Sequence, residues 1–459
     1  MKIVLSPLRP RHPRRQPVNG SLLIIVLWIT FGLVSVALYF GHSVLFELRA
    51  SDQNTAGVEA EQAIEGAARY LSFVVTNAAV PGQMPDTNLF QCDAVAVGDA
   101  TFWVIGRTNL EDKRDIPVFG LIDEASKLNL NTATLEMIEA LPLMTPELAA
   151  AIIDWRDADE DVSTNGAESE VYLRRNPPYR CKDAPFETVD ELRLVSGADM
   201  DLLYGEDANL NGVLDPNEND GTLTQPNDNQ DGVLNPGLLE FLTVYSREPF
   251  TNSYGTNRIN INSSSRQQLM TRLTDLFGES RAKEITNGLP AATAGTYPFS
   301  SLVAFFVRSK MTQTEFDQIA DDLSTTNNFI MGLINVNSAS ETVLGCIPGI
   351  GVDKAKSVVA YRQSHPTQLA SVAWLVQALD ETSAQQAGPY VTTRSYQFCA
   401  DIVAMGHHDR GYRRTCFIID TSEGTPKIIY RRDRGRLGWA LGALARQPGN
   451  LAGNTRTWR

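Results

Sequence analysis

One long apolar segment near the N-terminus constrains this chain more than any other feature. No Asp, Glu, Lys or Arg interrupts residues 16–46, and most side chains between 20 and 40 are aliphatic or aromatic. A run of about 20 apolar residues is long enough to cross a bilayer as a helix. Basic residues before the run, including Lys2, Arg14 and Arg15, and few after it predict a cytoplasmic N-terminus. The remainder of the chain is then expected beyond the membrane.

Two ordinary explanations of this segment are a permanent membrane anchor and a cleaved secretory signal. A secretory signal has a shorter apolar core, and a small-residue cleavage site follows that core. Here the small residue Gly20 precedes the apolar run. The order of these features therefore argues against a secretory signal.

The order of basic leader, glycine, small polar residue and unbroken apolar helix resembles the leader of type IV pilins and type II secretion pseudopilins. The resemblance implies that a prepilin peptidase cuts on the cytoplasmic side, between Gly20 and Ser21. Ser21 would then become a methylated N-terminus. The resemblance also implies a single-pass protein of the inner membrane with a periplasmic C-terminal domain, which is extracted into a filament.

One departure from the family pattern is informative. Most pilins carry Glu at the fifth mature position, where this chain has Ile25. An N-terminal ammonium in an apolar filament core is costly unless a carboxylate pairs with it. In the family, that Glu pairs with the ammonium of the subunit above. Pseudopilin K, the large minor pseudopilin, commonly lacks this Glu, so the resemblance points to that family and to the tip of the pseudopilus.

The pattern beyond the membrane segment predicts an α+β fold. A stem helix over 21–76 is expected to bury a stripe that runs from Leu45 and Leu48 to Val74, and to pack on an antiparallel sheet. The predicted divisions are a leader (1–20), the stem (21–76), the first part of the pilin-like domain (77–125), an inserted all-α domain (126–390), the closing strands (391–433) and a tail (434–459). The expected strands lie near 94–97, 101–106, 118–123, 396–404, 413–420 and 427–431, and the expected helices near 266–277, 280–286, 314–323 and 369–386.

A short Asn-x-Asn pattern occurs three times in the predicted insertion, at 128–132, 259–263 and 334–338. Each copy predicts a short β segment that ends in an N-cap residue before a helix. In the third copy, Ile347-Pro-Gly-Ile-Gly351 follows, so 334–364 resembles a helix-hairpin-helix unit. The first copy, 128–160, has a similar layout without the glycine turn. Related units occur in the helical insertion of pseudopilin K.

A helix-hairpin-helix unit has two interpretations, DNA binding and compact packing. DNA binding needs backbone amides and cations at phosphate groups, and the nearby cations are Lys354 and Lys356. The formal net charge of −14 repels nucleic acid. Packing is therefore favoured, and nucleic acid is not an expected partner.

The sharpest candidate metal site is a 12-residue loop from Asp207 to Glu218. An EF-hand loop takes oxygen ligands from positions 1, 3, 5, 7, 9 and 12 and has Gly at position 6. Gly212 occupies position 6 here. The expected calcium ligands are Asp207, Asn209, Asn211, the Val213 carbonyl, Asp215 and Glu218.

A second, poorer loop follows, and an acidic cluster precedes the first loop. The second loop supplies Asn227, Asn229, Asp231, Val233 and Asn235, but Leu238 stands at position 12 and Glu240 comes two residues late. The second loop can bind calcium weakly or complete a paired site.

The acidic cluster includes Asp154, Asp157, Asp159 and Glu168. It has two equally good interpretations, a solvated turn and a metal site with Asp157 and Asp159 as ligands. Calcium in these places would have a structural role.

The five cysteines cannot all pair within one chain. An exported location permits disulfides, and Cys399 and Cys416 lie in consecutive predicted strands, where they can face each other or remain unpaired.

His407 and His408 sit in a predicted turn with few other ligands near, so a solvated turn is favoured over a metal site. No catalytic motif stands out, and the protein is not expected to be an enzyme.

The resemblance as a whole implies a minor pseudopilin at the pseudopilus tip, with the smaller minor pseudopilins of the I, J and H types as partners. Such a subunit would prime filament assembly and support protein export across the outer membrane. One alternative is a membrane-anchored helix-hairpin-helix receptor for DNA, as in competence systems. Another is an anchored, calcium-dependent adaptor without processing at Gly20.

Overall fold

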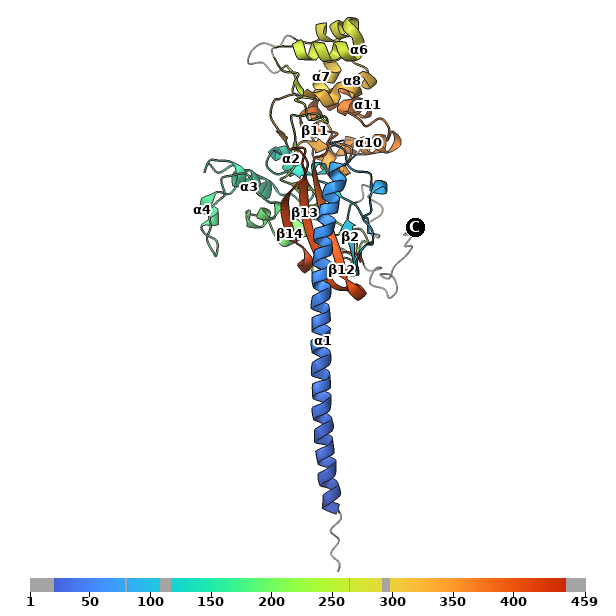
Figure 1. Cartoon of the computed structure of the whole chain (residues 1–459). Helices are drawn as coiled ribbons and strands as arrows, with labels where there is room; N and C mark the ends of the chain where they lie inside the picture. Colours follow the sequence, from blue (N-terminus) through green and yellow to red (C-terminus); the bar gives the residue numbers. More distant parts are fainter. Residues whose placement is uncertain (1–19, 79–80, 108–116, 264, 291–297, 443–459) are drawn as a thin grey trace, which may run out of the picture.

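The computed structural model describes residues 20–78, 81–107, 117–263, 265–290 and 298–442. It consists of a 57-residue helix, α1 (Gly20–Thr76), and a head beside the C-terminal half of that helix, as Figure 1 shows. The predicted basic leader lies outside the described residues, and so do the side chains of Gly20 and Ser21. By length and composition, α1 is able to cross a membrane.

Helix α1 buries one face only where it meets the head. Ala56, Ala60, Ile64 and Leu71 are each at most 1% exposed. Leu45 and Leu48 are more than half exposed, so the prediction that the packed stripe begins at Leu45 is wrong. Figure 1 shows the N-terminal half of α1 extending below the head, with no sheet beside it.

The sheet joins strands from the two ends of the chain, as predicted. Its order is β1-β2-β12-β13-β14, β3 also pairs with β12, and every pairing is antiparallel. The strands are β1 (Val95–Val97), β2 (Ala100–Ile105), β3 (Ile122–Asp123), β12 (Gln397–Gly406), β13 (Arg410–Asp420) and β14 (Lys427–Asp433). The face that carries Phe398, Ile402 and Phe417 packs against α1. The long N-terminal helix on an antiparallel sheet is therefore confirmed.

The turn between β12 and β13 touches the stem backbone. A Cβ atom on Gly406 would lie 2.2 Å from the Ala56 carbonyl oxygen, and one on Gly411 would lie 2.3 Å from the Ala56 carbonyl carbon. His407 adds hydrogen bonds to Glu59 and Asp52 of α1, at 2.7 and 2.9 Å. The two histidines therefore lie in a turn, as predicted, but His407 is docked on the stem.

We expect Gly406→Ala to destabilise the head by about 1–3 kcal/mol, because the added methyl group forces the turn away from a backbone that cannot yield. Urea unfolding of the full chain in detergent measures the change. Gly66→Ala is the matched control, since Gly66 is a helical glycine in α1 with open space around it. That variant should gain about 0.5–1 kcal/mol. Equal stability of the two variants would contradict the close approach.

The insertion contains helices and short strands. Its helices are α2 (Leu135–Glu139), α3 (Pro146–Arg156), α4 (Ser169–Tyr172), α5 (Met200–Tyr204), α6 (Gln267–Asn287), α7 (Leu302–Ser309), α8 (Gln313–Ile319), α9 (Glu341–Gly345), α10 (Gly351–Ser364), α11 (Leu375–Ala378) and α12 (Glu381–Ala387). Its strands are β4 (Leu128–Asn129), β5 (Leu242–Thr243), β6 (Arg247–Glu248), β7 (Ile259–Asn260), β8 (Leu323–Ser324), β9 (Ile330–Met331), β10 (Ile334–Asn335) and β11 (Val391–Thr392). The prediction of an all-α insertion is wrong in this respect.

The three Asn-x-Asn copies have one structural role. Each is a strand that pairs in parallel with the strand closing its own helical unit: β4 with β5, β7 with β8 and β10 with β11. In each copy the first Asn accepts a hydrogen bond from the backbone N–H two residues later. The second Asn bonds to a distant loop backbone, as when Asn262 exchanges two hydrogen bonds with Phe299. The repeat therefore satisfies buried backbone groups, which must be paired.

Several local predictions change in the structure. The helices expected over 266–277 and 280–286 form α6, which breaks at Gly278, where φ is 81°. The single helix expected over 369–386 is split, because Asp380 caps a new helix, α12. The predicted tail packs at its start, since Ala440 and Leu441 are buried against the sheet.

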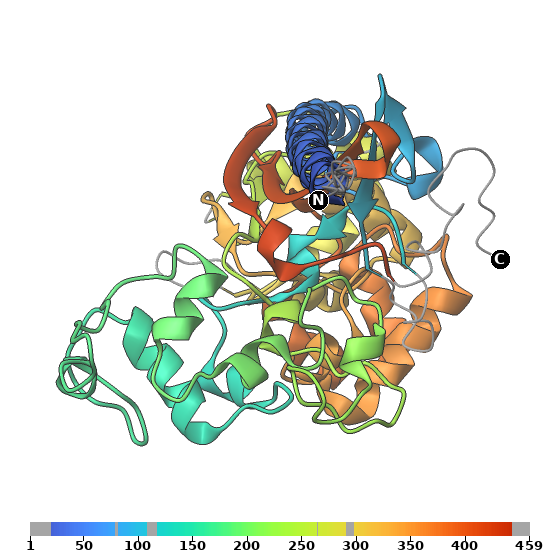
Figure 2. The same ribbon diagram turned by 90° about the horizontal axis from the view of Figure 1, so that it is seen from below.

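The insertion surrounds the sheet on two sides. Helices α6, α7 and α8 lie at the end of the head furthest from the N-terminus of α1, and α3 and α4 project to one side, as Figure 1 shows. The view along the stem in Figure 2 shows the cyan and green part of the insertion on the side away from α1. Most of the bulk of the head is therefore this insertion.

Candidate metal sites

The first predicted calcium loop follows α5 and ends in a short 3₁₀ turn, Pro216–Glu218. Its backbone has positive φ at Leu210 and Gly212, 54° and 72°. Glycine adopts this conformation without steric cost, which explains Gly212 at position 6. Asp207 and Glu218, the first and last predicted ligands, are each 1% exposed.

The side chains predicted as ligands form hydrogen bonds within this loop. Both Asp207 carboxylate oxygens accept backbone N–H groups, from Asn211 and Gly212, at 2.9 Å. Glu218 folds back to accept the N–H groups of Ala208 and Asp215, both at 3.0 Å. One carboxylate oxygen of Asp215 accepts the side-chain amides of Asn209 and Asn211, at 2.8 and 3.0 Å. The side-chain oxygen of Asn209 is buried without a hydrogen-bond partner among the described residues.

Several carboxylates buried together are costly unless a cation joins them. Burial raises the pKa of Glu218 to about 8, and the neighbouring Asp207 adds to that rise. Burial also raises the pKa of Asp207, although Arg107 opposes it. A divalent cation with a preference for oxygen would remove this penalty, and Ca²⁺ has that preference. The residues present fit calcium.

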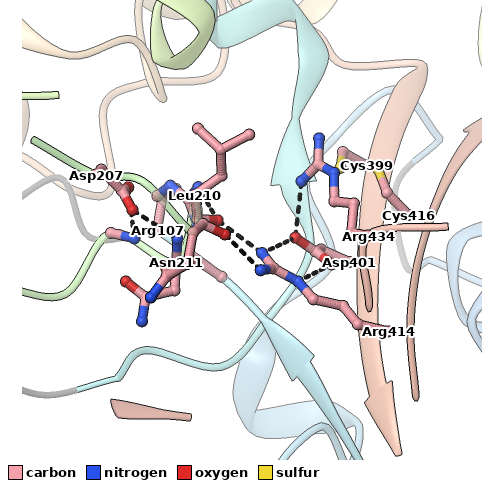
Figure 3. A network of polar contacts seen from close by, with 12 residues as sticks. Arg107, Asp207, Leu210, Asn211, Cys399, Asp401, Arg414, Cys416 and Arg434 are labelled. Atoms are coloured by element: carbon pink, nitrogen blue, oxygen red, sulfur yellow. Dashed lines mark hydrogen bonds and ion pairs between the residues drawn. The ribbon is translucent and has the colours of Figure 1, made fainter. Parts of the chain in front are cut away.

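Two arginines hold the loop on the antiparallel sheet, as Figure 3 shows. Arg414 of β13 donates to the carbonyl oxygens of Asn209 and Leu210, and Arg107 donates to Leu210 at 3.0 Å. Arg414 is in turn paired with Asp401 of β12. Neither arginine is marked by the local sequence, because the partners lie some 100–200 residues apart in the chain.

The second loop repeats the backbone of the first loop but not its burial. Gln230 and Gly232 have φ of 56° and 76°, at the same loop positions as Leu210 and Gly212. Asn227, Asn229, Asp231, Val233 and Asn235 are all exposed. Glu240, the late carboxylate, is paired with Arg107 at 2.8 Å. The second loop therefore offers fewer enclosed ligands.

The acidic cluster after α3 contributes to a second group of candidate ligands around Glu168, which is called the acidic pocket from here on. Glu168 is 2% exposed, and neither of its carboxylate oxygens has a hydrogen-bond partner in the described part of the chain. Ligand atoms of Glu168, Cys181 and Asp183 lie within 4.8 Å of one another. Burial raises the pKa of Glu168 to about 7, and the carboxylates of Asp154 and Asp183 raise it further. This arrangement suits a cation.

Only part of the sequence prediction for this cluster coincides with the pocket. Asp157 has one buried carboxylate oxygen without a hydrogen-bond partner among the residues described. Burial raises the pKa of Asp157 most, and the charges of Asp159, Asp154 and Asp183 raise it further. Asp159 is exposed, and one of its oxygens accepts the N–H of Asp161 at 3.0 Å. Cys181 and Asp183 were missed, since the chain returns to the pocket only after α4.

Residues 123–204 match the family model described as Type II secretion system (T2SS), protein K. The type II secretion system protein K of Klebsiella pneumoniae is 42% identical over 71 residues, which is 16% of this chain and 22% of that protein. The same-named protein of Pectobacterium carotovorum subsp. carotovorum is 45% identical over 56 residues, 12% of this chain and 17% of that protein. The chain thus spans about a fifth of the length of these curated relatives.

A solved structure is also similar, the GspK-GspI-GspJ complex of the enterotoxigenic Escherichia coli type 2 secretion system. The match covers 84% of this chain and 99% of the matched chain, with a TM-score of 0.38 and 13% identity. The sequence matches confirm the predicted resemblance, since residues 123–204 of this chain match a type II secretion system protein K domain. The segment contains the acidic pocket and ends just before the first loop.

Proposed function

We propose that this protein is a minor pseudopilin that caps the tip of a type II secretion pseudopilus. The proposal depends on two features that occur in one chain. These are a match to a protein K domain and an N-terminal helix whose first half is apolar and exposed. In this proposal, α1 anchors the subunit in the inner membrane, with its N-terminus in the cytoplasm and the head in the periplasm.

The shape of the head supports a tip position. The helical units lie beyond the end of α1 that is furthest from the membrane segment, as Figure 1 shows. Another subunit stacked above would meet this bulk. Ile25 in place of the usual Glu agrees with a subunit that has no neighbour above it. The proposed partners are the I, J and H types of minor pseudopilin, which would pack beside α1, help to initiate assembly and so support export across the outer membrane.

Calcium has a structural role in this proposal. The first loop would hold one ion through its buried oxygens, and the acidic pocket around Glu168 would hold another. The second loop would bind more weakly because its side chains are exposed. Both stronger sites lie where the chain has long segments without regular structure, and a bound ion would order those segments.

The alternative of a DNA receptor has less support. Lys354 is paired with Asp380 at 2.9 Å, and Lys356 lies 3.8 Å from Glu341. A Cβ atom on Gly349 would lie 2.5 Å from the Ser383 carbonyl oxygen, so this glycine turn packs on α12. We therefore propose that the units near 128–160 and 334–364 are helix-hairpin-helix-like packing units. An anchored adaptor that binds calcium, without leader processing, is the second alternative.

The test of the proposed class is the intact mass and N-terminal sequence of the membrane-extracted protein. The full chain is expressed with and without a prepilin peptidase. We expect a start at Ser21, with one added methyl group, only when the peptidase is present. A start at Met1 beside an active peptidase would refute the pseudopilin proposal and leave the adaptor or the DNA receptor. Low-salt duplex binding would then separate these two.

A further inference from the structure

Two cysteines lie together on the sheet face that is turned away from α1. Cys399 is on β12 and Cys416 is on the neighbouring antiparallel strand β13. Their sulfur atoms are 3.2 Å apart. They are 3% and 1% exposed, and they pack with Ile122 and Ile418. Figure 3 shows both sulfurs beside the arginine network.

The sheet register explains why the two sulfurs meet. Cys399 is opposite Ile418, and Cys416 is opposite Asp401, so the cysteines are diagonal neighbours on one face. The contact between these distant residues is fixed by strands of 10 and 11 residues that are each paired on both sides, since β12 also pairs with β2 and β13 with β14. A disulfide requires sulfurs about 2.0 Å apart. Small side-chain rotations would therefore close the remaining gap.

We propose that Cys399 and Cys416 form a disulfide bond between β12 and β13 after export. This inference rests on the proposed function only in placing the head in an oxidising compartment, where such bonds persist. Cys92, Cys181 and Cys346 are each buried elsewhere, without a cysteine partner among the described residues.

The oxidant is a protein or small-molecule disulfide. The Cys416 thiolate attacks one sulfur of that disulfide, which releases one oxidant thiolate and leaves a mixed disulfide. The Cys399 thiolate then attacks the Cys416 sulfur and releases the second oxidant thiolate. The two cysteine protons go to the two released thiolates, so the chain is oxidised by two electrons and the oxidant is reduced by two. Because both sulfurs are buried, the exchange takes place before β13 closes against the insertion.

In the closed head the two thiols have different surroundings. The hydrogen bond from Cys399 lowers the pKa of Cys416, and the Arg434 guanidinium lowers it further against the effect of burial. The pKa of Cys399 is raised. The resulting bond would join the two strands that complete the sheet after the whole insertion has been made. It would keep their register while the insertion folds.

The test uses the full chain, purified from membranes and unfolded in iodoacetamide without reductant. We expect Cys92, Cys181 and Cys346 to be alkylated, and Cys399 and Cys416 to appear as one linked peptide pair, lighter by two hydrogen atoms. In Cys399→Ser, Cys416 should become alkylated. Cys346→Ser is the matched control, since Cys346 is equally buried, and it should leave the linked pair intact.

Full alkylation of Cys399 and Cys416 in the wild type would overturn the proposal and leave a reduced pair joined by a hydrogen bond. A link from either residue to a third cysteine would also overturn it. A second experiment does not depend on export. In it, the reduced full chain is refolded in detergent with oxidised glutathione. Linkage there supports the bond even if processing at Ser21 fails. Absence of linkage there, in chain that refolds, counts against the bond itself.

Discussion

Replacing Asp401 by Ala is expected to lower the free energy of unfolding by about 3–5 kcal/mol. Asp401 and Arg414 are both fully buried, and two hydrogen bonds join them, at 2.9 and 2.6 Å. Arg434 contacts the same carboxylate at 2.8 Å. Without Asp401, the fully buried Arg414 and the partly exposed Arg434 would both lose this counter-charge. Urea unfolding of the full chain in detergent, followed by tryptophan fluorescence, measures the loss.

The matched control is Asp433→Ala, on the neighbouring strand β14. Asp433 is exposed, so its removal should change stability by no more than about 0.5 kcal/mol. Equal stability of the two variants would show that the buried carboxylate is not required. Burial would raise the pKa of Asp401, but Arg414 and Arg434 outweigh that effect and lower it. The contribution of Asp401 to the free energy of unfolding is therefore complete at neutral pH. It is lost only as the pH falls below the ordinary Asp pKa, about pH 4.

Removing calcium is expected to lower the melting temperature of the wild-type protein. At a free calcium concentration about 100 times the dissociation constant, one bound ion adds about 2.7 kcal/mol. Glu218→Gln should remove most of this difference, because it replaces the position-12 carboxylate with a neutral group. Asp231→Asn is the control, since it changes the exposed second loop, and most of the difference should remain.

The effect of calcium should also depend on pH in a defined direction. In the empty loop, the pKa of Glu218 is raised from its ordinary value of 4.5 to about 8. The folded protein then holds a proton that the unfolded chain releases, so its stability without calcium falls as pH rises from about 4.5 to 8. Calcium needs the ionised carboxylate. The difference in melting temperature between loaded and calcium-free protein should therefore widen over that range.

Thermal unfolding from pH 5 to pH 8, with dialysed protein and with added calcium, tests both statements. Identical melting temperatures with and without calcium at pH 8 would contradict a calcium role. Any difference that remains in Glu218→Gln would be assigned to the acidic pocket. Adding Glu168→Gln to that variant should then remove it.

The sequence was most informative where the signal is local. The apolar run predicted α1, the alternating segments predicted the six strands of the sheet, and the loop spacing predicted the sharp turn at Gly212. The Asn-x-Asn copies marked the three strand-and-helix units. In each case the residues that interact lie within a few positions of one another, so helical, strand or loop periodicity contains the information.

Tertiary structure decided which distant residues meet. It brought Cys181 and Asp183 to Glu168, placed Arg107 and Arg414 under the first loop, and set the sulfurs of Cys399 and Cys416 side by side. It also buried Ala440 in a segment predicted to be a tail. Such contacts join residues that are widely separated in the chain, and the packing of the insertion against the sheet selects them. The sequence by itself determined the stem helix and the strands of the main sheet, whereas the arrangement of charges and thiols between elements depended on how those elements pack.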